Sequence, residues 1–575
     1  MRRHATGARD GQPELAFYPS RQKDRHAMTT LSAFSDLVRS YVADYLDFYP
    51  TLGTRLGLHL YDGRTEDYTR PAIDHWLRTL TQWERRLAGL PRESLSAAEQ
   101  HDAALLETAI AHERFAWEHL RDHERNPLWG NDSLDVTPYL KRNYAPLHER
   151  LRALASHLEH VPGYLEQLRG HLQPSLARPL LTTALEIYQG YLAFLTDTLP
   201  VEIARTDDAS VRRRAAAAAE RAVEALRGHL DYLDAARART TDAFAIGEEL
   251  CREMLRTREM VDVPLDRLLA LGDAELARLH DDVRATAAHL APGADPRQVI
   301  ARLGQDHPPA ERLLEETRAL LEDLRRFLID RAIVTLPDEE RPRVDQTPPF
   351  ARWAFAMMDT AGPFETTATE SYYYITLPDP TWAPEQRAQR LTKFDYATLK
   401  AVSVHEAYPG HFVHVLYGVN RAPSVAARVF TAYSFVEGWA HYCEEMMLEA
   451  GIDPSPRFRL ACLSEALVRV VRYLVAIRMH AGGIPLDEAA RMFREQAFME
   501  PITAEKEAVR GTFDPGYLNY TLGEFLLRRL RDDYRAERGA AFSLREFHDR
   551  LIALGAPPFP LARRALLATP GDRLL

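Results

Sequence analysis

The sequence has few cysteines and no long apolar run. Only three cysteines occur in 575 residues, Cys251, Cys443 and Cys462, and no two of them form a Cys-x-x-Cys pair. A disulfide framework and a thiolate zinc cluster are therefore excluded. The most apolar helical stretch, residues 466–479, contains three arginines, so it does not predict a membrane-spanning helix.

The chain also lacks an excess of positive charge. It has 72 basic and 83 acidic residues, a net charge of −11, so we do not expect a nucleic-acid-binding surface. The hydrophobic fraction of 46% and the charged fraction of 27% are typical of a folded globular protein. The length is sufficient for a large core, or for two lobes around a cleft.

The first residues carry charge but no apolar segment. Residues 1–27 therefore predict no secretory signal and are expected to form a disordered extension. A polar Thr-Thr pair follows Met28 and precedes an amphipathic run, as at the start of a helix. From these features we expect a cytoplasmic protein that does not associate with membranes.

Helical periodicity dominates the rest of the chain. Apolar residues recur at three- and four-residue spacing in many segments, which predicts a mainly α fold. These segments are 31–49, 73–90, 98–122, 139–158, 211–238, 243–258, 264–290 and 310–332. The proline-rich stretch 336–350 predicts a boundary between an N-terminal helical lobe (28–345) and a C-terminal lobe (346–575). Residues 370–380 are aromatic and β-branched and form the best candidate strand.

Two histidines and a glutamate form the pattern with the clearest chemistry. His405 and Glu406 end an apolar helical run, and His411 follows six residues after His405. A zincin helix uses His-Glu-x-x-His, because four residues turn about 400° and bring both imidazoles to one face. Six residues turn about 600°, which would point His411 roughly 120° away from His405. A regular helix therefore does not build this site.

The inserted residues Pro409 and Gly410 offer a way to restore the geometry. Proline has no N–H for the preceding turn and its ring clashes with that turn. Glycine adopts almost any backbone conformation. If the pair loops out, His411 returns to an effective four-residue offset, about 40° from His405. The sequence therefore predicts a bulge between two helical segments.

Glu437 is the candidate third ligand. It lies in a segment with helical periodicity, and its neighbours Phe435 and Trp439 are apolar. A carboxylate that points into protein is rarely left without a partner. Two histidines, one glutamate and an open fourth position make the pattern of catalytic zinc. With 22 histidines in the chain, a His-Glu pair at this spacing can also occur by chance. If the pattern is a metal site, we expect Zn²⁺ at His405, His411 and Glu437.

Other polar residues near this pattern have simpler interpretations. We expect His414 to lie on the helix surface or to pack against other side chains rather than to bind a metal, and His441 to lie beside the ligands at most. The acidic residues Glu444, Glu445 and Glu449 are expected on a solvated helix face.

The motifs HEAYPGH (405–411) and VEGWAHYCE (436–444) resemble the signature of a large bacterial domain-of-unknown-function family in the zincin metallopeptidase clan. That signature is HExxPGH followed by EGWAxYxE. Similarity extends over most of the chain after about residue 30, in the segments 48–64, 247–272, 472–493 and 514–531.

This resemblance implies a gluzincin-like fold that is mainly α-helical, with two lobes around an active-site cleft and a small β element near the metal. It implies zinc ligands at His405, His411 and Glu437. It also implies that Glu406 is the general base.

The resemblance further implies residues that contact the substrate. The strand YYYITLP (372–378) is similar to the edge strand along which such enzymes bind a substrate backbone, so Tyr372 and Tyr374 are expected to bind substrate. Tyr520 and His480 are the candidates that would stabilise the oxyanion.

Three functions remain open from the sequence. The first is a zinc-dependent hydrolase of peptide or related amide bonds, in which Glu406 takes a proton from the attacking water. The second is a zinc amidase or esterase that acts on a specialised metabolite. The third is a helical binding protein with an inactive, metal-free site, although such a protein has no physical reason to keep Glu406. The expected partner is a peptide or small amide, with no nucleic acid and no membrane.

Overall fold

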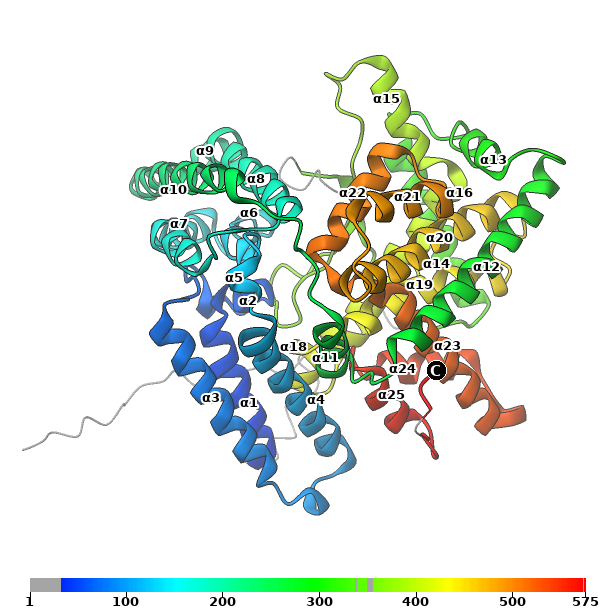
Figure 1. Cartoon of the computed structure of the whole chain (residues 1–575), viewed down its shortest axis with the longest axis horizontal. Coiled ribbons are helices and arrows are strands. Elements are labelled where there is room, and N and C mark those ends of the chain that lie inside the picture. The colour runs from blue at the N-terminus through cyan, green and yellow to red at the C-terminus, as the bar shows by residue number, and fades with distance from the viewer. Residues whose placement is uncertain (1–32, 337–338, 349–354, 572) are drawn as a thin grey trace, which may run out of the picture.

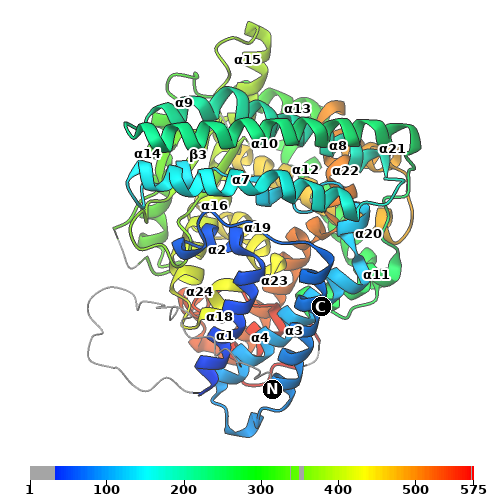
Figure 2. The same cartoon turned by 90° about the vertical axis from the view of Figure 1, so that its left-hand side faces the viewer.

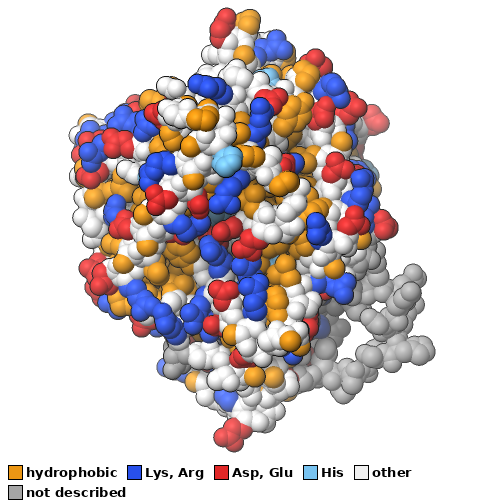
Figure 3. Space-filling view, turned by 90° about the vertical axis from the view of Figure 1, so that its right-hand side faces the viewer, with side chains coloured by type: hydrophobic (Ala, Val, Ile, Leu, Met, Phe, Trp, Pro, Cys, Tyr) orange, Lys and Arg blue, Asp and Glu red, His pale blue; other side chains and the backbone are white. Residues whose placement is uncertain are grey.

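The computed structural model confirms a mainly helical fold. It describes residues 33–336, 339–348, 355–571 and 573–575. Helices make up 71% and strands 3%, as expected from the dominant 3.6-residue periodicity. The extension predicted at residues 1–27 lies outside the described residues. Acidic and basic side chains are interspersed over the face shown in Figure 3.

The N-terminal helices, blue to green in Figure 1, form one side of the molecule. They are α1 (Ala33–Phe48), α2 (Pro50–Arg55), α3 (Arg70–Ala88), α4 (Ala97–Arg114), α5 (Asp122–Arg125), α6 (Pro138–Lys141), α7 (Leu147–His171), α8 (Arg178–Ala193), α9 (Leu199–Ala204) and α10 (Ala209–Ala236). The long helices α7 and α10 lie side by side, as both views show (Figures 1 and 2).

Helix α10 illustrates how the sequence specifies these elements. Its alanine-rich segment has the highest intrinsic helix propensity. The Asp208 side chain caps the helix by accepting hydrogen bonds from the N–H groups of Ser210 and Val211. Buried residues such as Ala215 and Ala222 recur on one face, so the small side chains let α10 pack along α7.

The remaining helices include α16, α17 and α19, on which the three candidate metal ligands lie. They are α11 (Glu248–Glu259), α12 (Leu265–Leu290), α13 (Pro296–Leu303), α14 (Leu313–Asp330), α15 (Pro384–Leu391), α16 (Tyr396–Glu406), α17 (His411–Val413), α18 (Val425–Val429), α19 (Tyr433–Glu449), α20 (Pro456–His480), α21 (Leu486–Gln496), α22 (Pro501–Phe513), α23 (Asn519–Arg538), α24 (Leu544–Ile552) and α25 (Phe559–Leu566). Helices α16, α19, α20 and α23 pack against one another around these ligands.

The small sheet has three strands in the order β1-β3-β2. They are β1 (Arg343–Gln346), β2 (Ala356–Asp359) and β3 (Tyr372–Ile375). The strand expected in 370–380 is present as β3, but the expectation that it is an edge strand is wrong. Strand β1 pairs with it in parallel and β2 pairs with it antiparallel. Both partners come from segments with weak strand signals, so the sequence did not reveal that β3 is central.

The apolar core of the described residues consists of two large clusters and a small third one, formed by Ala401, Phe458, Ala461 and Cys462. The first unites residues from α1 to α10 with residues 422–430 and Leu561. The second includes most buried apolar residues from Phe244 to the C-terminus. Most buried residues of the first cluster lie before residue 236, and most of the second lie after residue 244. The lobe boundary expected at residue 345 stays a prediction. Helices α11 to α14 contribute buried residues to the second cluster.

Two glycines fix α19 against α23. A Cβ atom at Gly523 would overlap the Ser434 carbonyl oxygen, and one at Gly438 would lie 2.5 Å from the Gly523 backbone. The two helix backbones therefore approach more closely than side chains would permit. Because Gly438 follows Glu437, this contact also sets the position of the candidate ligand.

We predict that Gly523→Ala lowers the free energy of unfolding by roughly 1–3 kcal/mol, because the new methyl group forces the two helices apart. Gly228→Ala on α10 is the matched control, since a Cβ there has no atom within 4 Å. It should raise stability by about 0.5–1 kcal/mol. Urea unfolding of both variants tests this; equal stability changes would show that the close approach is not a constraint.

Candidate metal centre

The chain loops out between α16 and α17. Helix α16 ends at Glu406 and the next helical segment begins at His411. The Gly410 N–H donates a hydrogen bond to the Val404 carbonyl over 3.0 Å. A Cβ atom at Gly410 would overlap the His405 carbonyl oxygen, so only glycine fits. The bulge that the Pro-Gly insertion predicts is present.

The loop is held from the neighbouring helix. The buried Trp439 on α19 donates its indole N–H to the Pro409 carbonyl over 2.9 Å. Trp439 lies two residues after Glu437, on the same helix. The same hydrogen bond therefore fixes both the loop that delivers His411 and the helix that delivers Glu437.

His405, His411 and Glu437 come together in space. Each residue offers one ligand atom, and these three atoms lie within 4.8 Å of one another. The Glu437 Oε2 atom is 3.7 Å from His405 Nε2 and 3.5 Å from His411 Nε2. The two imidazole rings are nearly perpendicular, with centroids 4.8 Å apart. No other group of this kind occurs among the described residues.

The chemistry of these three groups fits a zinc ion. The buried Glu437 Oε2 has no hydrogen-bond partner among the described residues, although it lies between two imidazole nitrogens. Burial raises the pKa of Glu437, but His411 and His405 outweigh it and hold the pKa well below its usual range. An ionised carboxylate oxygen and two imidazole nitrogens are the usual donors of a catalytic zinc site.

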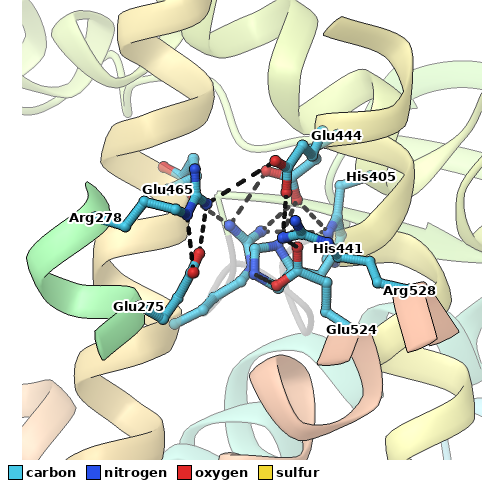
Figure 4. A network of polar contacts seen from close by, with 10 residues as sticks. Glu275, Arg278, His405, His441, Glu444, Glu465, Glu524 and Arg528 are labelled. Carbon is cyan, nitrogen blue, oxygen red and sulfur yellow. Dashed lines mark hydrogen bonds and ion pairs between the residues drawn. The ribbon is translucent and has the colours of Figure 1, made fainter. Parts of the chain in front are cut away.

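Glu444 contacts the Nδ1 atom of His405, the ring nitrogen that does not face Glu437. Its Oε1 lies 2.7 Å from His405 Nδ1 (Figure 4). The same oxygen lies 2.9 Å from the Arg469 guanidinium. A carboxylate on the second imidazole nitrogen fixes the ring and leaves Nε2 for a metal. Burial and Arg469 lower the pKa of His405, but the nearby carboxylates of Glu437 and Glu444 raise it to about 9. A metal therefore competes with a proton for this ring.

The expectation that Glu444 lies on a solvated face is wrong. Its exposed fraction is 2%, whereas the side chains of Glu445 and Glu449 are 32% and 47% exposed. Glu444 lies seven residues after Glu437, and a seven-residue spacing puts two side chains on one helix face. The seven-residue spacing could have indicated that Glu444 is buried, but Glu445 and Glu449 made the segment look like a solvated acidic face.

A buried polar network surrounds this support (Figure 4). Arg469 also contacts Glu465 over 3.4 Å, and His441 Nε2 lies 3.3 Å from Glu524 on α23. Burial and the nearby Glu445 raise the pKa of Glu524 well above its usual range. The support of His405 therefore spans α19, α20 and α23, and His441 lies beside the ligands as expected.

Glu406 is held by the sheet. Its Oε2 accepts a hydrogen bond of 3.1 Å from the backbone N–H of Met358 on β2. Glu406 is also the last residue of α16 and the neighbour of His405. The candidate base is therefore positioned from both sides, by the helix and by the outer edge of β2.

Tyr520 lies close to the ligand group. Burial raises the pKa of Tyr520, and the charge of Glu437 adds to this effect. The Arg510 guanidinium donates to the hydroxyl groups of both Tyr520 and Tyr433 over 3.5 and 3.4 Å. Tyr433 is a residue that the sequence did not single out; it begins the same helix as Glu437, with its ring centroid 5.9 Å from that of Tyr520.

Two other histidines have partners elsewhere. His480 is 1% exposed and its Nε2 bonds the Gly511 carbonyl over 2.7 Å, so its contacts are outside the ligand group. Burial lowers the pKa of His480 to about 4. His414 is buried and bonds the Gly555 carbonyl over 3.0 Å, as expected for a packing residue.

Tyr372 and Tyr374 share one face of β3, with stacked rings 5.3 Å apart. The Arg142 guanidinium lies over the Tyr372 ring and binds Asp359 on β2 over 3.1 Å. Tyr373 points to the other face, where its hydroxyl contacts Ser403 on α16 over 3.3 Å. Substrate contact by Tyr372 and Tyr374 stays a prediction.

The fold and the centre together define a large helical protein in which two histidines and a glutamate come together. The neighbouring Glu406 contacts the edge strand of a small sheet. The chain belongs to a bacterial family of proteins of unknown function, DUF885, whose sequence profile matches residues 50–566. No curated protein matches the chain.

Two solved structures share the fold. One is a candidate lipoprotein of unknown function from Shewanella oneidensis, with 22% identity and a TM-score of 0.79 over 93% of this chain and 99% of that chain. The other is a candidate lipoprotein from Colwellia psychrerythraea, with 16% identity and a TM-score of 0.79 over 93% of this chain and 98% of that chain.

These relatives contradict the expected cytoplasmic location, because both are candidate lipoproteins. A lipid on a chain end can hold a folded domain at a membrane without any apolar run inside that domain. Composition therefore does not determine the compartment. Within the described ranges, no helix is long and apolar enough to cross a bilayer.

We predict that Glu444→Gln weakens zinc binding about 10- to 100-fold, because the His405 ring loses its negatively charged support. Isothermal titration of the metal-free variant with zinc measures this. Glu449→Gln on the same helix is the matched control, since its partner is Arg531 rather than a ligand.

Glu444→Gln also removes one of the carboxylates that neutralise the buried charge of Arg469. Unfolding of the metal-free variant is therefore measured in parallel, to separate a loss of stability from a loss of zinc binding. The double variant Glu444→Gln, Arg469→Gln restores charge balance and should still bind zinc weakly. Wild-type affinity in this folded double variant would contradict the supporting role of Glu444.

Proposed function

We propose that this protein is a zinc-dependent hydrolase of peptide or related amide bonds. The observation that carries the proposal is the convergence of three donor atoms within 4.8 Å, beside a carboxylate held by a strand edge. A metal-free binding protein would leave the buried Glu437 Oε2 with long ion pairs of 3.7 and 3.5 Å to the two imidazoles and without a hydrogen bond, at a cost in stability.

Zinc, when bound by His405, His411 and Glu437, supplies a Lewis acid that activates water and polarises a carbonyl group. Glu406 takes a proton from the attacking water and passes it to the leaving amine. Glu444 keeps the His405 ring oriented throughout. The hydrogen bond from Met358 keeps the Glu406 carboxylate at one place during both proton transfers.

The edge of β2 favours a peptide over another amide. Thr376 donates its N–H to the Phe355 carbonyl, so alternate residues from Phe355 face β3. The backbone groups of Ala356 and Met358 consequently face away from β3, and the Met358 N–H is the group that meets Glu406. An extended peptide would add to this outer edge by backbone hydrogen bonds. Backbone pairing with the substrate was expected of β3, but β3 is paired on both sides, so we assign this role to β2.

Tyr520 is the proposed donor to the oxyanion. Arg510 occupies the hydroxyl oxygen as a donor, which leaves the hydroxyl proton available for a developing negative charge. His480 is the weaker candidate, because its Nε2 is engaged by the Gly511 carbonyl.

We predict one zinc ion per chain. His405→Ala and His411→Ala should each reduce the bound zinc by more than half, because a two-donor site binds zinc weakly. His148→Ala, a partly exposed histidine on α7, is the control and should keep full occupancy. Elemental analysis after dialysis measures the metal, and far-UV circular dichroism checks the fold. Full zinc occupancy in both ligand variants would reject the assignment.

We predict that Glu406→Gln keeps zinc but lowers turnover by roughly 10²–10⁴, because the proton acceptor is removed. Tyr520→Phe should lower kcat by roughly 10²–10³ with little change in KM. Tyr232→Phe, on the surface of α10, is the control. Peptide-library digestion followed by mass spectrometry identifies a substrate for these assays. Wild-type kcat in Tyr520→Phe would move the donor role to another residue.

A further inference from the structure

Strand β2, which contacts the proposed base, has only one strand neighbour. It pairs with β3 from Ala356 to Asp359, and no strand of the described chain pairs with its outer edge. On that edge, the Met358 N–H donates to the Glu406 carboxylate over 3.1 Å. A strand of four residues with one neighbour has few backbone hydrogen bonds of its own. The place of the Met358 N–H therefore depends on what else holds the ends of β2.

The Arg142 side chain holds the end of β2 that lies next to Met358. Its guanidinium donates to the Asp359 carbonyl over 3.0 Å and to the Asp359 carboxylate over 3.1 Å. It also donates to the carbonyl of Glu370, shortly before β3 begins. Asp359 is the last residue of β2 and follows Met358 directly. One guanidinium therefore joins the end of β2 to the start of β3.

This geometry differs from that of a simple ion pair. An ion pair needs only two charged groups, whereas Arg142 also binds two backbone carbonyls from separate segments. The planar guanidinium presents its N–H groups in a fixed fork, so it sets the distance and direction between its acceptors. Within the described chain, Asp359 has no other ion-pair partner. The end of β2 is therefore fixed to the guanidinium through both its backbone and its side chain.

The N-terminal helices in turn hold Arg142. It follows α6 directly, and its side chain is 12% exposed. Arg150 on α7 donates hydrogen bonds of 2.7 to 2.9 Å to three groups close to Arg142 in the chain, which are the carbonyls of Tyr139 and Ala145 and the side chain of Asn143. The guanidinium therefore extends from a fixed segment, and its position relative to β2 is set by α6 and α7.

Other contacts between the N-terminal helices and the sheet region lie farther along the chain from Met358. The Phe364 N–H donates to the Leu56 carbonyl over 3.0 Å. His59 Nε2 lies 2.9 Å from Glu365 Oε2. Both contacts reach the connection between β2 and β3 rather than a residue of β2. They therefore provide a control for simple adhesion between the same two parts of the molecule.

We propose that Arg142 is a positioning residue for the base Glu406. It fixes the end of β2, and β2 keeps the Met358 N–H on the Glu406 carboxylate. The proposal rests on the hydrolase function proposed above. A displacement of about 1 Å in a reacting group can lower a rate about 100-fold, so the place of this carboxylate matters for turnover. The N-terminal helices, which carry none of the three candidate ligands, thus contribute to the reaction through one side chain.

Hydrogen exchange tests the positioning without any need for turnover. Exchange at the Met358 N–H of the full-length, zinc-loaded protein is followed by mass spectrometry with residue resolution. Arg142→Met keeps most of the aliphatic stem and removes every donor, so Met358 should exchange about tenfold faster, because the strand end opens more often. Arg142→Lys keeps the charge but loses the fork, and exchange about threefold faster is expected. The lysine variant decides the test if Arg142→Met does not fold.

His59→Phe is the matched control at the same interface. It removes the ion pairs to Asp62 and Glu365, but an aromatic ring can still stack on Tyr144, whose ring centroid lies 3.6 Å from that of His59. This variant should lose stability in urea without faster exchange at Met358.

Turnover separates positioning of the base from a general structural role. On a substrate found by peptide-library digestion, Arg142→Met should lower kcat about tenfold, with KM and zinc content changed by less than about twofold. Added to Glu406→Gln, the same substitution should change the remaining turnover by less than about twofold, because no base is left to position. A general loss of structure would lower turnover equally in both backgrounds.

The outcomes distinguish the two proposals. Unchanged exchange at Met358 in the Arg142 variants would overturn the positioning role, as would equally fast exchange in His59→Phe or an equal loss of turnover with and without Glu406. Faster exchange in the Arg142 variants alone, with no cleavage by the wild-type protein, would support the hold of Arg142 on the Met358–Glu406 contact and reject the hydrolase. Cleavage with wild-type kcat in Arg142→Met would reject the positioning role alone.

Discussion

The path of the backbone between His405 and His411 controls the whole centre. Gly410 packs so closely on the His405 carbonyl that no side chain fits there, and its N–H returns to Val404. This contact ends α16 at Glu406 and restarts the helix at His411, so that both imidazoles face Glu437. The two residues inserted into the zincin spacing are therefore the means by which the second histidine reaches the site.

Helix α19 supplies the acidic half of the centre. Glu437 and Glu444 are seven residues apart on one helix face. Glu437 lies close to the Nε2 atoms of both histidines, and Glu444 contacts the Nδ1 atom of His405. Trp439 between them anchors the loop through Pro409. The contact between Gly438 and Gly523 fixes the position of α19 against α23, and α23 also contains Tyr520. Ligand, support, loop anchor and proposed oxyanion donor thus depend on one helix pair.

Much of this arrangement could be predicted from the sequence, because local patterns determine local structure. The bulge at Pro409 and Gly410, the strand at Tyr372–Ile375 and most long helices were predicted from backbone chemistry and periodicity. The role of Glu444 and the central position of β3 were not. Each depends on contacts between segments far apart in the chain: Glu444 with Arg469, and β3 with β1 and β2. Periodicity shows which residues are buried but not which partners they meet.

X-ray absorption at the zinc edge of the purified, zinc-loaded protein tests the central claim most directly. A site formed by His405, His411 and Glu437 predicts imidazole scattering from two nitrogens at about 2.0–2.1 Å, with the remaining ligands oxygen at about 2.0–2.2 Å. Sulfur scattering at about 2.3 Å, or a zinc with no imidazole contribution, would contradict the account, because it would place the metal away from the bulge that this fold builds.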